Sequence, residues 1–146
     1  MGFLLDRKRS TAFTHIKTIH QKLRTVHNKS WEVGLFEESG KHSSGWSYVA
    51  LGSYLSSGDM KRNLVGRPFL DVSFAFNGRK YQQMFKKAFA HYLLSDSKNT
   101  SIDAFVLKLA KVQTNDVKAI FGNPALLASN KPSTINKKGH NSPLVD

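Results

Sequence analysis

The chain has 146 residues and no cysteine, and its 22 Lys and Arg against 10 Asp and Glu give a formal net charge of +12. This length suits one domain, and the lack of cysteine excludes a disulfide framework and a thiolate metal site. The charge favours a partner that carries phosphate or an acidic protein surface. No apolar run approaches the roughly 20 residues needed to cross a bilayer, so a soluble protein is expected.

The N-terminal third of the sequence predicts one helix followed by one strand. Ser10 or Thr11 caps the expected helix, because apolar residues then recur at steps of three and four. Beyond Asn28, alternating residues over 31–36 indicate a half-buried strand, and the composition of 39–45 indicates a flexible loop. The apolar positions of the helix are Phe13, Ile16, Ile19, Leu23 and Val26.

The middle of the sequence predicts two helices separated by an exposed loop. Residues 46–55 suit either a short helix or a strand, and the helix is favoured because Gly58 then marks its exit. Residues 59–66 are expected to form the loop. Beyond Pro68, a long amphipathic helix is predicted over 69–94, with Phe69 buried at its start. Gly78 weakens its middle by about 1 kcal/mol relative to Ala and marks a kink or a break.

The C-terminal part of the sequence predicts two further helices and then an extended arm. Ser101 caps the first helix, and Asp116 lies in the cap region of a shorter second one that ends near Gly122. Prolines and polar residues over 123–146 leave little apolar surface, so this segment is predicted to be ordered mainly by another chain. The expected fold is therefore α+β: a small antiparallel sheet packed against two or three helices in one domain (1–122), with an extended C-terminal assembly arm (123–146).

No catalytic pattern is found in the sequence. Phosphate-binding glycine loops, nucleophile elbows and paired carboxylates are absent, and the six histidines lack the four-residue helical spacing of a zinc pair. The phenylalanines between 69 and 89 have helical spacing, which favours core packing over a platform for stacked bases. No enzyme, metal site or cofactor is expected.

Two separate segments carry a resemblance to a known family. The first is Val65-Gly66-Arg67-Pro68-Phe69-Leu70, and the second runs from Asn130 to Asp146, with Thr134-Ile135, Lys138-Gly139 and Pro143-Leu144-Val145-Asp146. In this order they resemble the lambda-like neck and tail-completion proteins of tailed bacteriophages. That family pairs an "ARPFL" segment with a later "Thr-Ile-x-x-Lys-Gly…Pro-Leu-Val-Asp" element. Val49-Ala50 and Val117-Lys118 match shorter family elements, although the acidic residue that accompanies the first is missing here.

The resemblance implies a non-enzymatic structural protein of the virion, made in the host cytoplasm and located at the head-to-tail junction. Its partners would be copies of itself in a ring, with six-fold order favoured over twelve-fold, and neighbouring connector, head-closure, tail-terminator or tail-tube proteins. DNA would pass through the ring without sequence recognition, and no membrane is involved. The residues expected at the subunit interface are Arg67, Pro68, Phe69, Leu70, Lys131, Thr134, Lys137, Lys138, Pro143, Leu144, Val145 and Asp146.

A small basic nucleic-acid-binding protein is the alternative from another functional class. It requires a continuous positive face and an affinity that falls steeply as salt rises. A head-closure or adaptor subunit at another level of the same junction is a third reading of the sequence.

Overall fold

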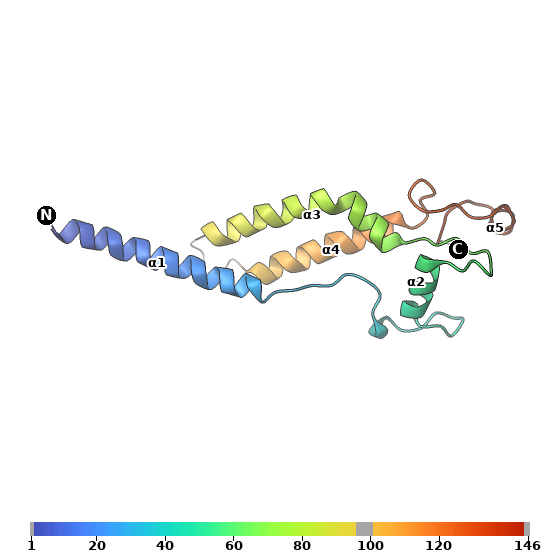
Figure 1. Ribbon diagram of the computed structural model, residues 1–146, viewed down its shortest axis with the longest axis horizontal. Coiled ribbons are helices and arrows are strands. Elements are labelled where there is room, and N and C mark those ends of the chain that lie inside the picture. Colours follow the sequence, from blue (N-terminus) through green and yellow to red (C-terminus); the bar gives the residue numbers. More distant parts are fainter. Residues whose placement is uncertain (1, 96–100, 145–146) are drawn as a thin grey trace.

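The computed structural model describes residues 2–95 and 101–144, with side chains from residue 13 onward. Within these ranges the chain is helical and elongated (Figure 1). The only β-type pairings in the described parts are two isolated bridges, Lys41 with Ser47 and Asp59 with Leu64. The elements in chain order are α1 (Gly2–His27), the 3-10 helix η1 (Glu37–Ser39), α2 (Tyr48–Ser57), α3 (Phe69–Leu94), α4 (Ile102–Ile120) and α5 (Pro132–Lys138).

Helices α3 and α4 lie side by side and form the body of the molecule (Figure 1). The predicted helix over 69–94 is confirmed with these bounds, and Gly78 does not break it. The predicted start of α4 after Ser101 is also confirmed, because Ser101 Oγ accepts a hydrogen bond from the Asp103 N–H at 3.2 Å. The two short helices expected after Ser101 are instead the single helix α4. The core cluster at one end of this pair contains Phe69, Val117, Ile120 and Leu127.

The α+β fold with a small antiparallel sheet is wrong, since the described residues form helices and no sheet. Residues 31–36 have the alternation of a strand but find no neighbouring strand with which to pair. Their side chains pack on helices instead: the Trp31 ring stacks on Phe85 of α3 at 6.3 Å between centroids. The Trp31 Nε1–H also donates to Gln113 Oε1 of α4 at 2.9 Å. Trp31 and Val33 are therefore partly buried against helices, while Glu32 and Gly34 between and after them are exposed. This gives the alternating pattern of a strand without a sheet.

The extended C-terminal arm is also wrong for residues 123–144, which fold back on their own chain. Leu127 lies in the core with Phe69, Pro143 is fully buried, and the Gly122 N–H donates to the Pro143 carbonyl oxygen at 2.7 Å. The prolines interrupt helices, yet the apolar residues between them are sufficient to bury this segment. The domain boundary predicted at residue 122 stays a prediction, although Leu127 on one side of it packs in the core with Phe69 on the other.

Helix α1 projects away from the body (Figure 1). It begins at Gly2, eight or more residues before the start expected at Ser10 or Thr11. Near its end, Lys22 Nζ donates to the carbonyl oxygens of Tyr92, at 2.8 Å, and Ser95, where the negative end of the α3 dipole favours a cation. Phe13 and Ile16 are 71% and 65% exposed. Among the described residues, no helix combines the length and apolar character that a membrane span requires.

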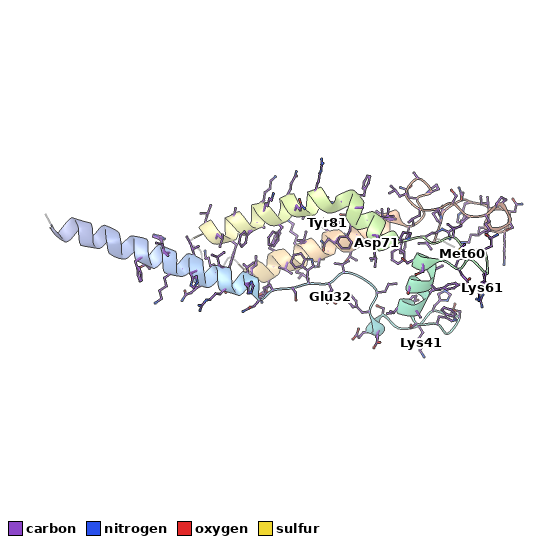
Figure 2. All side chains as sticks on the ribbon, in the orientation of Figure 1. Glu32, Lys41, Met60, Lys61, Asp71 and Tyr81 are labelled. Carbon is purple, nitrogen blue, oxygen red and sulfur yellow. The ribbon has the colours of Figure 1, made fainter. Side chains whose placement is uncertain are left out.

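Residues 58–66 form a tight turn that leads into α3. The Asp59 carboxylate accepts hydrogen bonds from the backbone N–H groups of Lys61 and Arg62 at 2.9 and 3.2 Å, as is common at the start of such turns. Met60 at the tip is 98% exposed, at the end of the molecule opposite the start of α1 (Figure 2). The loop expected here is therefore an ordered turn that fixes the position of Arg67.

Replacing Gly78 with Ala is expected to stabilise the protein. A Cβ built at Gly78 meets no atom within 4 Å, and Ala is favoured over Gly inside a helix by about 0.5–1 kcal/mol. The melting temperature followed by circular dichroism should rise by about 2 °C. Gly58→Ala is the contrasting variant, because φ at Gly58 is +74° and the new Cβ would lie 2.5 Å from the Gly66 nitrogen. A lower melting temperature for Gly78→Ala would contradict the prediction.

Candidate functional site

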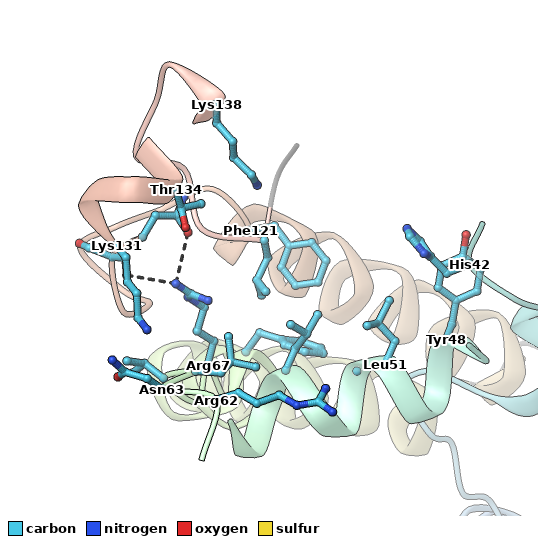
Figure 3. Close-up of a pocket in the computed structure, with 18 of the residues that line it drawn as sticks. His42, Tyr48, Leu51, Arg62, Asn63, Arg67, Phe121, Lys131, Thr134 and Lys138 are labelled. Carbon is cyan, nitrogen blue, oxygen red and sulfur yellow. Dashed lines mark hydrogen bonds between the residues drawn. The ribbon is translucent and has the colours of Figure 1, made fainter. Parts of the chain in front are cut away.

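A cavity of about 640 Å³ lies between α2, the 58–66 turn, the start of α3 and the α5 region (Figure 3). We refer to it as the basic apolar pocket. One wall comes from residues near the middle of the sequence, and the opposite wall comes from residues 129–144. The residues that line it are Leu35, His42, Tyr48, Leu51, Gly52, Leu55, Arg62, Asn63, Leu64, Val65, Arg67, Phe69, Phe121, Ser129, Asn130, Lys131, Thr134, Lys138 and Leu144.

Arg67 holds the two walls together. Its Nε–H donates to the Ala128 carbonyl oxygen at 2.7 Å, and its Nη2 donates to the Ser129 carbonyl oxygen at 3.0 Å and to Asn130 Oδ1 at 3.2 Å. The planar guanidinium suits several acceptors at fixed angles. The Arg67 backbone N–H donates to the Leu55 carbonyl oxygen at 2.8 Å, which ties the same residue to α2. Arg67 is therefore a structural link between segments about 60 residues apart in the sequence.

The charge on the pocket lining is positive. Arg62, Arg67, Lys131 and Lys138 line the pocket, and no Asp or Glu of the described residues lines it. Burial lowers the pKa of Arg67 from its usual value, but a guanidinium stays protonated at neutral pH. Arg62 pairs with Asp59 at 3.7 Å, and the Arg62 side chain is 73% exposed. Such a long, partly exposed ion pair contributes little stability. The pocket thus attracts an anionic group.

The apolar part of the lining comes from several elements. Leu51 and Leu55 are four residues apart on α2, so both face the pocket. Phe69 and Phe121 lie beside them, with ring centroids 5.1 Å apart in an edge-to-face arrangement. Apolar surface beside a few cationic groups suits a partner that presents an apolar side chain next to a carboxylate or phosphate.

The structure brings together about half of the residues predicted for the subunit interface. Arg67, Phe69, Lys131, Thr134, Lys138 and Leu144 line the basic apolar pocket. Pro68 and Lys137 are exposed outside it, Leu70 packs against the core, and Pro143 is buried. Val145 and Asp146 lie outside the described residues. Tyr48, Leu51, Arg62 and Asn130 also line the pocket, although they were not among the residues predicted for the interface. The one local signal for them was the four-residue spacing of Leu51 and Leu55 on a predicted helix.

Other polar and apolar features of the molecule are less suited to bind a partner. A shallower cavity of about 450 Å³ lies between α3 and the start of α4, beside Tyr92 and Ile102. Burial raises the pKa of the Tyr81 phenol, so this group is even less able to ionise than an exposed tyrosine. Across the side chains of residues 13–95 and 101–144, no three His, Asp or Glu residues gather as they would around a metal ion.

The chain matches no family model, no curated protein and no solved structure. The resemblance to tail-completion proteins therefore rests on the two sequence segments, and the function it implies stays a prediction.

Proposed function

We propose that this chain is a non-catalytic subunit that assembles with copies of itself into a ring at the head-to-tail junction of a tailed bacteriophage. The observation that carries the proposal is the position of the two segments that resemble this family. Residues 67–70 and 130–144 are far apart in the sequence, yet Arg67 joins them at one pocket. A family element built from two distant segments is expected to form one contiguous surface.

The exposed surfaces of the molecule also support self-assembly. Phe13 and Ile16 on α1 are largely exposed, and Leu35 and Phe36 beside α2 are 39% and 42% exposed. Apolar side chains that cluster on a surface commonly mark protein interaction sites. Because these surfaces differ from one another, contacts between them would be heterologous, as the subunits of a ring require.

We expect the purified protein to form closed rings, with six-fold order favoured. Sedimentation velocity over a range of concentrations measures the oligomer, and electron microscopy of the recombinant protein or of virions shows the ring and its level. A protein that is monomeric both in solution and in virions would overturn the proposal.

A basic DNA-binding protein remains the second candidate, because the sequence of α1 is cationic and most of its side chains from residue 13 onward are exposed. Between Asp6 and Glu32 the sequence contains Lys and Arg but no acidic residue. Binding of a short DNA duplex, with an affinity that falls by orders of magnitude as salt is raised from about 50 to 200 mM, would favour this candidate if the protein is also monomeric.

A further inference from the structure

A short acidic turn projects beside α2. We define the acidic turn as Phe36, Glu37 and Glu38, which comprises two of the three glutamates of the chain. All three side chains are exposed, Phe36 by 42%. The turn is ordered, because the Phe36 N–H donates to Ser39 Oγ at 3.2 Å and the Ser39 N–H donates to the Phe36 carbonyl oxygen at 3.0 Å. An aromatic ring and two carboxylates are thus held together on the surface.

The carboxylates of this turn differ from three other acidic groups among the described residues. Asp103 pairs with Lys29 at 2.7 Å, Asp116 pairs with Lys80 at 2.7 Å, and Asp59 binds the backbone of its own turn. Among the described residues, no ion pair reaches Glu37 or Glu38. In a chain with a net charge of +12, two copies can attract each other electrostatically only where such an acidic group meets a basic one.

We propose that the acidic turn of one copy docks in the basic apolar pocket of the next copy. Phe36 would lie against the apolar wall at Leu51 and Leu55, and Glu37 and Glu38 would face Lys131 and Arg62. A volume of about 640 Å³ lies within the range of roughly 300–1,000 Å³ of pockets that hold small ligands, so it accommodates an aromatic ring with an adjoining side chain.

The position of the turn favours contact between copies over contact within one copy. Leu35 lies on the rim of the pocket of its own chain, in contact with α2 at Gly52, whereas Phe36 does not line that pocket. The turn and the pocket are therefore different surfaces of one molecule. When each copy uses its turn on one neighbour and its pocket on another, the contact is heterologous, and its repetition gives a ring when the rotation closes. This inference rests on the proposed function and names the surfaces through which it would operate.

Disulfide trapping tests the contact directly, because the chain has no cysteine of its own. A Glu38→Cys chain is mixed with a Thr134→Cys chain under mild oxidation, and linked dimers are measured by non-reducing electrophoresis. Thr134 lines the pocket, whereas its neighbour Ser133 is exposed outside it. Ser133→Cys is therefore the matched control, and random collision would favour it. We expect at least about tenfold more dimer with Thr134→Cys, and an equal or smaller yield overturns the inference.

A charge swap gives an independent test in the full-length protein. One variant carries Arg62→Glu and Lys131→Glu in the pocket, and the other carries Glu37→Lys and Glu38→Lys in the turn. Each variant alone places like charges together, so its self-association should weaken by on the order of tenfold or more. In a mixture of the two, each pocket meets a turn of opposite charge, and sedimentation velocity should show that association returns.

The matched control for the charge swap is Lys61→Glu with Lys137→Glu. It makes the same change in net charge at exposed residues outside the pocket, and it should associate as the unmodified protein does. If the unmodified protein forms rings and the pocket variant forms them equally well, the inference is wrong and the proposed ring function stands. If the unmodified protein does not associate, and the Glu38→Cys and Thr134→Cys chains give no more dimer than the Ser133→Cys control, the inference is wrong. The proposed ring function is overturned as well if the protein is also monomeric in virions.

Discussion

Replacing Phe69 with Ala should lower the free energy of unfolding by about 3–5 kcal/mol, the usual cost of truncating a buried phenylalanine. Phe69 is 4% exposed and belongs to the core cluster with Val117 and Leu127. Its ring also contacts Phe121 at 5.1 Å between centroids. The truncation would therefore open a cavity where α3, α4 and the segment after α4 meet. Urea unfolding followed by far-UV circular dichroism measures the change.

Phe76→Ala provides a matched control for this prediction. Phe76 lies on the same helix two turns later and is 71% exposed, so its truncation should change stability by less than about 0.5 kcal/mol. Equal effects of the two substitutions would show that Phe69 is not buried in the folded protein.

Arg67→Ala should destabilise the protein by about 2–4 kcal/mol. The substitution removes a charged donor from the carbonyl oxygens of Ala128 and Ser129 and from Asn130 Oδ1. Each hydrogen bond to a charged group contributes roughly 1.5–3 kcal/mol net. The substitution also removes the cost of burying a guanidinium, so the net loss is smaller than the sum of the three hydrogen bonds. Hydrogen exchange should show the largest loss of protection in residues 128–144, because these residues lose their link to α3.

Two further substitutions separate geometry from charge at this position. Arg67→Lys keeps the cation but loses the planar arrangement of donors, so it should recover only part of the stability. Arg62→Ala removes a neighbouring, exposed cation and should be nearly neutral. If Arg67→Lys is as stable as the unmodified protein, charge alone would account for the role of Arg67.

The sequence predicted well the helices whose start residues and apolar spacing lie close together in the chain. Helix α3 follows Pro68 and has an apolar face at helical spacing, and α4 starts with the cap Ser101. The strand at 31–36 was predicted wrongly because its alternation depends on distant partners. Gln113, which binds Trp31, is 82 residues away. Local periodicity cannot distinguish a surface formed by helices from one formed by strands.

The candidate site was also hard to predict from the sequence, because its residues lie far apart along the chain. Arg67 and Lys131 were expected together only through the family resemblance, since nothing local links them. The pocket forms because residues 123–144 fold back over α2 and α3. The composition of this segment predicted an arm, because prolines and polar residues outnumber apolar ones. The burial of Leu127 and Pro143 depends on surfaces that the segment itself does not contain.

Because residues 129–144 form one wall of the pocket, docking of this segment and occupancy of the pocket are thermodynamically linked. When residues 129–144 detach, the binding surface is lost. Any occupant of the pocket therefore stabilises, by mass action, the closed state in which these residues are docked. At a free concentration about 100 times its dissociation constant, an occupant contributes about 2.7 kcal/mol to the closed state. A subunit joined to its neighbour would therefore hold its C-terminal segment more firmly than a free subunit does.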